Sequence, residues 1–219
     1  MVAFEIRAPG SIVGKKIIDL FAGVGGLSLG AARAGFSLSA VVGVDKHAAE
    51  AHRKNFPLTK HLSEDAASLS GSRLLELAGV PAGQLDGLVG GPPCQGFSDI
   101  GLKSDLDPRN ELLVHFFRLV AETSPVFFLA ENVPGVISLR NAATLKRALA
   151  KVPSQYTVLD PITVTASKHG APTTRTRVFF YGYDAERIGK LTEDDFEPVS
   201  NSDVRVRDAL DGLPTIRSD

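Results

Sequence analysis

The sequence predicts an α/β fold in which a mostly parallel β-sheet is covered by helices on both faces. The chain has 219 residues, 43% of them hydrophobic, which is enough apolar material for one domain with a sizeable core. Short apolar runs typical of buried strands alternate along it with segments typical of helices. Glycine- or proline-rich turns follow several of these segments, as expected where buried elements end.

The strands are expected where short apolar or β-rich runs meet a turn signal. The first stops at a cluster of glycines, the third leads directly into the segment that holds the only cysteine, and the last is rich in aromatic side chains. The expected strands cover residues 17–21, 39–44, 85–89, 126–130, 156–164 and 178–183.

The helices are expected where apolar residues recur at helical spacing or where alanine is frequent. Gly35 ends the first helix, Pro57 terminates the second, and Pro125 ends the amphipathic third. The expected helices cover residues 27–34, 46–55, 110–123 and 144–150.

The composition narrows the class of protein. Charged residues make up 22% of the chain and their signs alternate, so a long disordered tail is not expected. The net charge of -1 carries no signature of nucleic-acid binding, so such a partner has to be argued from local clusters. A single cysteine rules out an internal disulfide and suits a reducing compartment, and no signal peptide or membrane span is seen. We therefore expect a cytoplasmic protein with no membrane contact and no metal site.

Polar loops leave three of the strands at the edge of the sheet where ligands bind in such folds. In the first loop, residues 19–26, glycines let the backbone approach a ligand and offer N–H groups at the start of a helix. Ser28 stands where a dinucleotide fingerprint would have its third glycine. The loop by itself leaves open both a nucleotide-like ligand and an ordinary tight turn.

The second loop, residues 90–98, contains the only cysteine, Cys94. A structural cysteine usually lies in an apolar run, where it behaves as a small hydrophobic residue. Cys94 instead follows two prolines and precedes Gln95 and a glycine. This setting makes it a candidate nucleophile.

The third loop, residues 131–135, places Glu131 directly after an apolar strand. Such a carboxylate is either a cap for the next turn or a partly desolvated acid. Further along, Arg175 and Arg177 flank Thr176, so both side chains point the same way on an extended chain. They lie either in a site or in solvent at the entry of a strand.

The three loops and the arginine pair, in their order and approximate spacing, resemble the DNA (cytosine-5) methyltransferases over nearly the whole chain. The resemblance implies a Rossmann-like sheet with one late antiparallel strand, as in class I S-adenosylmethionine-dependent methyltransferases. The implied reaction moves a methyl group from S-adenosyl-L-methionine to carbon 5 of cytosine and leaves S-adenosyl-L-homocysteine. The matching segments are residues 19–26, 90–98, 131–135 and 175–178, with Asp65, Pro125 and residues 107–110 as further matches.

The resemblance implies catalytic roles for four side chains. Cys94 would add to carbon 6 of the base, which makes carbon 5 an enamine-like nucleophile for the methyl group. Glu131 would contact and protonate ring N3 and so draw electron density from carbon 6. Arg177 would hold oxygen O2 of the base, and Arg175 would position the catalytic loop.

The same resemblance implies a site for the methyl donor. Phe21 matches an aromatic residue that stacks on the adenine, and Asp65 matches an acid that contacts the adenine amino group. The glycines that follow Phe21 would line the methionine end. The implied cofactor-binding residues are Phe21, Ala22, Gly23, Val24, Gly25, Gly26, Asp45, Asp65, Pro93 and Leu112.

Two positions depart from the family's pattern. The acid that usually binds the ribose hydroxyls near the end of the second strand is replaced by Gly43, and Asp45 matches a different position. The ribose contact is therefore left unassigned by the sequence. The glutamine that precedes the two arginines is Thr173 here, which removes a long hydrogen-bonding side chain but keeps both guanidinium groups.

The implied partner is double-stranded DNA, from which the target base must be flipped because it cannot be reached inside a duplex. DNA binding would also bring the protein to the nucleoid. Gln95 and Ser98 would lie on the loop that closes over the DNA, and Asn132 and Val133 are further implied DNA contacts. Side chains that would reach phosphates, unless they are ordinary solvated charges, are Lys103, Arg109 and Lys168.

Residues 1–199 are expected to form the catalytic domain, and residues 200–219 to lead into a target-recognition region absent from this chain. The chain is then a catalytic fragment or one subunit of a split enzyme, with a second polypeptide supplying the rest, and restriction-modification is the implied setting. Two alternatives remain open. One is a non-catalytic regulatory paralogue that binds a partner methyltransferase, and the other is a tRNA cytosine-5 methyltransferase.

Overall fold

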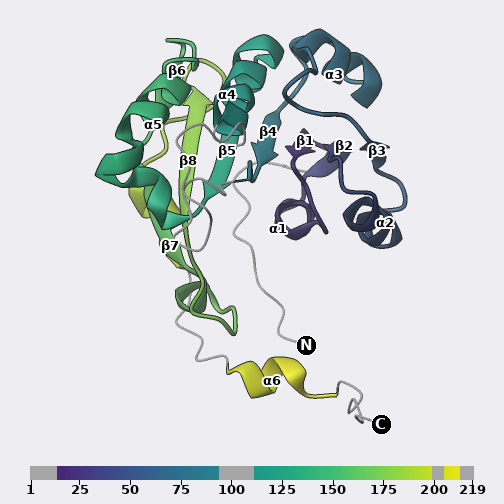
Figure 1. Ribbon diagram of the computed structural model, residues 1–219, viewed down its shortest axis with the longest axis vertical. Helices are drawn as coiled ribbons and strands as arrows, with labels where there is room; N and C mark the ends of the chain where they lie inside the picture. The colour runs from purple at the N-terminus through teal and green to yellow at the C-terminus, as the bar shows by residue number, and fades with distance from the viewer. Residues whose placement is uncertain (1–13, 94–110, 199–204, 213–219) are drawn as a thin grey trace.

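The structure is a computed structural model that describes residues 14–93, 111–198 and 205–212 (Figure 1). Within these residues, eight strands form one sheet in the order β3-β2-β1-β4-β5-β8-β6, and β7 also pairs with β8. The strands are β1 (Lys16–Leu20), β2 (Ser37–Val42), β3 (Lys60–Leu62), β4 (Gly87–Gly90), β5 (Phe127–Asn132), β6 (Tyr156–Val158), β7 (Ile162–Thr165) and β8 (Thr176–Asp184).

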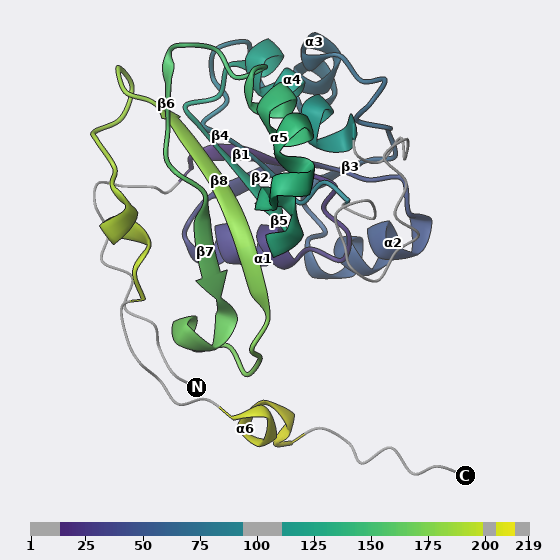
Figure 2. The ribbon, with the colours of Figure 1, turned by 60° about the vertical axis from the view of Figure 1, so that its left-hand side comes forward.

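Helices cover both faces of this sheet, as predicted. Figure 2 shows α3, α4 and α5 over one face and α1 and α2 against the other. No helix in the described part of the chain is both long and apolar enough to cross a membrane. The α-helices are α1 (Gly26–Arg33), α2 (Lys46–Asn55), α3 (Gly71–Ala78), α4 (Glu111–Thr123), α5 (Ala142–Leu149) and α6 (Val206–Leu210), and the 3-10 helices are η2 (Pro134–Ile137), η3 (Leu139–Asn141), η4 (Ala166–His169) and η5 (Glu193–Phe196).

One strand of the sheet runs against the others. The strands β1 to β5 pair in parallel, β8 pairs antiparallel with β5, and β6 and β7 pair antiparallel with β8. The prediction of a mostly parallel, Rossmann-like sheet with one late antiparallel strand is confirmed. The reversal brings the carboxyl end of β5 and the amino end of β8 to the same edge, where Asn132 lies opposite Val178.

The core over β4, β5 and β8 is built by α4. Its apolar residues recur at helical spacing, so that Phe116, Phe117 and Val120 are fully buried. The ring of Phe117 meets Phe128 of β5 at 5.5 Å and Phe180 of β8 at 6.4 Å between ring centres, edge to face in both cases. This packing holds β5 and β8 together below the edge at which they present their polar residues.

Two strand boundaries differ from the prediction in a way that matters for the site. The strand expected at 126–130 continues two residues further, and the strand expected at 178–183 begins two residues earlier. The ladder between β5 and β8 supplies the hydrogen bonds that extend both. Glu131 therefore lies on a strand, and the expectation that it lies in the loop after β5 is wrong. Arg177, expected just before the last strand, lies within it.

The β-rich run at 156–164 is two strands, because Pro161 between them has no N–H to donate to a sheet. The other predicted elements agree with the structure to within two residues at each end, where the structure describes them. β3, α3 and α6 were not predicted. The helix α3 does carry both boundary signals, since the Ser70 hydroxyl accepts from the amide of Arg73 and Gly79 closes the helix at a φ of 70°.

Candidate active site

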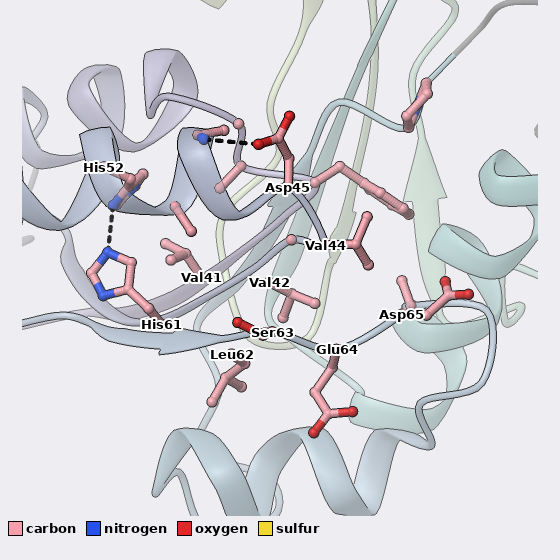
Figure 3. Close-up of a pocket in the computed structure, with 18 of the residues that line it drawn as sticks. Val41, Val42, Val44, Asp45, His52, His61, Leu62, Ser63, Glu64 and Asp65 are labelled. Carbon is pink, nitrogen blue, oxygen red and sulfur yellow. Dashed lines mark hydrogen bonds between the residues drawn. The ribbon is translucent and has the colours of Figure 1, made fainter.

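A pocket opens at the carboxyl ends of the first strands (Figure 3). Its walls come from the turn after β1, the end of β2 with the first turns of α2, and β3 with the residues that follow it. Pro93, after β4, and Leu112, on α4, complete the lining. The empty volume is about 860 Å³, part of it open to solvent, and the walls are mostly apolar. This is the position at which ligands bind in open α/β sheets.

The turn after β1 is held in an unusual backbone conformation. Gly23 and Gly25 have φ values of 54° and 101°, which glycine adopts freely. Phe21 also has a positive φ, 58°, although aromatic residues rarely adopt it. The amide of Ala22 donates to the carbonyl oxygen of Val42 at 3.2 Å and so ties the turn to the end of β2. Strain of this kind concentrates at functional sites, and here it lies on the pocket wall.

Two carboxylates at the pocket rim are fixed by backbone amides. Oδ1 of Asp45 accepts from the amides of His47 at 2.8 Å and Ala48 at 3.0 Å, and so caps α2. The hydrogen bonds from Ala48 and His47 lower the pKa of Asp45, which keeps it ionised. Oδ1 of Asp65 accepts from the amide of Ala67 at 2.9 Å. Both acids therefore present negative charge in defined orientations.

A second group of polar residues lies where β5 and β8 end side by side. Nε of Arg177 is 2.7 Å from Oε1 of Glu131, with 19% and 25% of the two side chains exposed. Nη1 of Arg177 also donates to the carbonyl oxygen of Thr176 at 2.7 Å. The structure thus joins, in one ion pair, the two side chains to which the sequence assigns the contacts with the base.

The segment Gly91, Pro92 and Pro93 lies between this ion pair and the pocket. A side chain on Gly91 would meet Oε2 of Glu131 at 3.1 Å, so the backbone passes directly beside the carboxylate. Nδ2 of Asn132 donates to the carbonyl oxygen of Pro92 across a long 3.5 Å. Pro93 lines the pocket. These three consecutive residues therefore connect the ion pair between Glu131 and Arg177 with the pocket.

The implied cofactor residues divide into two sets. Val24 is 66% exposed, Gly25 is buried behind the turn, and Gly26 opens α1, and none of the three lines the pocket. Those that line it are Phe21, Ala22, Gly23, Asp45, Asp65, Pro93 and Leu112.

The remaining implied residues are placed only in part. Arg175 is exposed, and its carbonyl oxygen accepts from the amide of Ala166 at 2.9 Å. The amide of Val133 donates to Oδ1 of Asn132 at 2.9 Å at the start of η2. The implied residues that lie outside the described part of the chain are Cys94, Gln95, Ser98, Lys103 and Arg109.

A chain of polar side chains beside the pocket was not predicted. Oγ of Ser28 lies 2.5 Å from Oδ2 of Asp19 and 3.0 Å from Nε2 of His52. Nδ1 of His52 lies 2.9 Å from Nε2 of His61, and both rings line the pocket. Asp19, Ser28 and His52 are fully buried. The four residues lie on four different elements, so no spacing in the sequence indicates that they meet.

The fold and the site together define a class of protein. A sheet in the order 3-2-1-4-5 with a reversed strand beside β5, and a pocket at the glycine turn after β1, are the features of a class I S-adenosylmethionine-dependent methyltransferase.

The chain belongs to the family of C-5 cytosine-specific DNA methylases, whose sequence model matches residues 15–217. The type II methyltransferase M.AgeI of Thalassovita gelatinovora is 38% identical over 174 residues, which are 79% of this chain and 41% of that protein. M.AquIA of a Picosynechococcus species is 35% identical over 185 residues, 80% of this chain and 73% of that protein. The chain spans only 39% of M.XorII and 49% of M.DdeI. It thus covers about two fifths to a half of most of these relatives.

Solved structures agree with this assignment. A proposed DNA modification methyltransferase encoded within a prophage of E. coli superposes with a TM-score of 0.82 at 46% identity, over 92% of this chain and 56% of that one. The Dnmt2 methyltransferase of S. pombe gives a TM-score of 0.68 at 19% identity, over 93% of this chain and 60% of that one. The second likeness shows the shared fold alone.

Proposed function

We propose that the chain is the catalytic portion of an enzyme that methylates carbon 5 of cytosine in double-stranded DNA, with S-adenosyl-L-methionine as the donor. One observation carries this proposal. The segment from Gly91 to Pro93 passes beside Glu131 and also lines the pocket, and Cys94 follows it directly in the sequence. The nucleophile that the family resemblance assigns is thus the next residue after a segment that touches both Glu131 and the pocket.

The lining of the pocket supports binding of the methyl donor. Its apolar walls suit an adenine ring, with Phe21 available for stacking, and its rim offers the carboxylates of Asp45 and Asp65 to amino and hydroxyl groups. When bound, the donor supplies a methyl group on a positively charged sulfur. The chain's own residues would hold and orient that group toward the base and keep water away from it.

The ion pair between Glu131 and Arg177 suggests how the base is activated. Without a base, the Arg177 guanidinium is paired with the Glu131 side chain. A flipped cytosine presents N3 and O2 side by side, so Glu131 would face N3 while Arg177 turns to O2. The Glu131 carboxyl group would then contact N3 and supply a proton there. That proton draws electron density out of the ring and makes carbon 6 open to attack.

Covalent catalysis would follow at Cys94. Its thiolate forms a bond to carbon 6, and the electron pair of the 5,6 double bond makes carbon 5 nucleophilic. Carbon 5 would take the methyl group as its bond to the donor's sulfur breaks and S-adenosyl-L-homocysteine leaves, and carbon 5 would then lose its proton to solvent. The bond between sulfur and carbon 6 then breaks, which restores the aromatic ring and the free cysteine.

We also propose that the relatives' additional length holds the region that selects the DNA sequence. Residues 1–199 would be the catalytic domain and residues 200–219 the lead-in to that region, which lies on the same polypeptide or on a second one. This proposal is supported by the exposed apolar side chains of α6, Val206 at 57% and Leu210 at 56%. Such side chains are suited to packing against a further part of the enzyme.

Covalent trapping tests the proposal. Fluorine at carbon 5 cannot leave as a proton, so duplex DNA of mixed sequence containing 5-fluorocytosine would hold the enzyme at the adduct stage. With S-adenosyl-L-methionine present, we expect a denaturation-resistant complex whose cross-linked peptide contains Cys94, and none from a Cys94→Ala variant. A wild-type chain that binds both the donor and the DNA yet gives no complex contradicts the mechanism. Transfer RNA containing 5-fluorocytosine, run in parallel, checks the choice of DNA.

A substitution at Gly43 tests the position of the ribose. Gly43 lines the pocket, and a Cβ built on it meets no atom within 4 Å beyond its two chain neighbours, so a side chain there would begin in open space. A Gly43→Glu variant would offer a carboxylate to the ribose hydroxyls. Because a hydrogen bond to a charged group contributes about 1.5–3 kcal/mol, we expect calorimetry to show donor binding tightened by about 10-fold or more. Gly189→Glu, at another open glycine away from the pocket, is the matched control, and equal affinities for both variants would contradict the assignment.

A further inference from the structure

The chain of four polar side chains, Asp19, Ser28, His52 and His61, links the buried end of β1 to the pocket wall. Above about pH 7, where Asp19 is ionised, the hydrogen bonds of this chain run in one direction. The Ser28 hydroxyl donates to Asp19, so it accepts from Nε2–H of His52. His52 in that tautomer has an acceptor at Nδ1, which receives Nε2–H of His61. Every link is satisfied when both rings are neutral.

The ring of His52 also supports the glycine turn directly. A Cβ on Gly25 would lie 2.8 Å from Cδ2 and 3.1 Å from Nε2 of His52, so the ring packs flush against the backbone of the turn. Phe56, the residue that follows the end of α2, backs the same ring at 4.6 Å between ring centres. The His52 ring therefore packs against the glycine turn after β1. Ser28, on α1 just after that turn, is hydrogen-bonded to the same ring.

We propose that His52 is a positioning residue for the methyl donor: its neutral ring, held between Ser28 and His61, fixes the glycine turn against the pocket, and a second proton on the histidine pair releases it. The inference rests on the proposed function, since the ligand of the pocket is taken to be the donor. Figure 3 shows the pair at the pocket wall. His52 itself transfers no proton to the substrate and acts through the turn.

Protonation works against this arrangement. One extra proton can be shared, but two charged rings would set N–H against N–H across the 2.9 Å contact. Burial, followed by the neighbouring charge of His61, lowers the pKa of His52 below its usual value, and burial together with Arg53 lowers the pKa of His61. The other ionisable groups around the pair are Asp19 beyond Ser28 and the rim carboxylates, which include Asp45.

The direction of the pH effect follows from these lowered pKa values. Because the histidines are neutral in the state that holds the turn, donor affinity is full above their ordinary pKa of 6.5 and is lost as the pH falls through the lowered values. The wild-type chain is therefore expected to bind S-adenosyl-L-methionine more weakly at about pH 5.5 than at about pH 7.5.

Two amide substitutions of His52 separate its contacts. The side chain of His52→Gln reaches as far as Nε2, can donate to Ser28, and does not ionise. That of His52→Asn reaches only as far as Nδ1 and leaves Ser28 without its donor. Calorimetry with S-adenosyl-L-methionine is expected to show His52→Gln within about 3-fold of wild type at pH 7.5 with its acid-dependent loss removed, and His52→Asn about 10-fold weaker. His47→Gln, an exposed histidine on the same helix, is the control and should keep the wild-type pH profile.

The outcomes separate this inference from the function on which it rests. A wild-type chain that does not bind the donor at any pH overturns the proposed function. A wild-type chain that binds it equally at both pH values, or a His52→Gln variant that keeps the acid-dependent loss, overturns the inference. If circular dichroism shows that His52→Asn is unfolded, the comparison of wild type with His52→Gln still decides, because it needs only folded proteins.

Discussion

Replacement of Glu131 by glutamine is expected to lower methyl transfer to DNA by about 100-fold to 10,000-fold, the range that a positioned general acid contributes. The amide is nearly isosteric, and its oxygen can still accept from Arg177, so the edge between β5 and β8 should keep its geometry. What the amide lacks is an acidic proton that it can transfer to N3 of the base, since its NH2 group can only donate a hydrogen bond there. The rate of labelled methyl transfer from S-adenosyl-L-methionine, measured beside donor affinity, checks this expectation.

A matched control for this variant is Glu76→Gln. Glu76 pairs with Arg73 on α3 at 2.8 Å, so the same substitution is made in an ion pair of similar length away from the site. The control should leave methyl transfer unchanged, and both variants should bind the donor as the wild type does. A Glu131→Gln protein that retains more than about a third of the wild-type rate would show that another group holds the proton at N3.

Replacement of Asp19 by asparagine is expected to stabilise the fold, and to do so more at high pH. Asp19 is fully buried, and its Oδ1 has no hydrogen-bond partner in the described part of the chain. Burial raises the pKa of Asp19 from 3.8 to about 7, against hydrogen bonds from Ser28 that lower it. The folded state thus holds this proton more tightly than the unfolded state, so stability is full below pH 3.8 and is lost as the pH rises to about 7.

The size of this loss follows from the shift in pKa. At about 1.4 kcal/mol per pH unit, the charged carboxylate costs the wild type roughly 4 kcal/mol above pH 7, of which about 2–3 kcal/mol arises between pH 5 and pH 8. Urea unfolding of wild type and Asp19→Asn at these two pH values measures the difference. The exposed Asp160→Asn serves as the control and should show no such pH dependence. An advantage for Asp19→Asn that is equal at both pH values would show that the carboxyl group does not ionise within this range.

Much of the fold could be predicted because residues inside or next to many of its helices and strands mark their boundaries. The helix at Lys46–Asn55 has a capping acid before it and a proline after it, and its predicted bounds agree with the structure. β3 has only three residues and takes its place from the ladder with β2, which no local pattern reveals. In the same way, β5 and β8 extend each other, and their true lengths depend on a partner distant in the sequence.

The site residues that belong to a sequence motif could be predicted. Those brought together only by the packing of distant elements could not. Resemblance pointed to Phe21, Asp65 and Pro93, and the structure places all three around one pocket. The contact between His52 and His61 arises because α2 and β3 pack together beside the turn, and neither histidine belongs to a motif. Contacts of this kind depend on the tertiary arrangement, so one sequence by itself does not reveal them.

The reversed direction of β8 has a consequence for how such an enzyme diversifies. A sheet whose strands all run the same way receives side chains at its working edge only from strand ends. Here that edge takes Glu131 from the end of β5 and Arg177 from the beginning of β8. The acid and the cation therefore lie on separate segments of the chain, which are connected through α5, β6 and β7. A change in the length of the connection between β5 and β8 would therefore shift the cation relative to the acid, and so alter how the base oxygen is held, while the strand that carries the acid stays as it is.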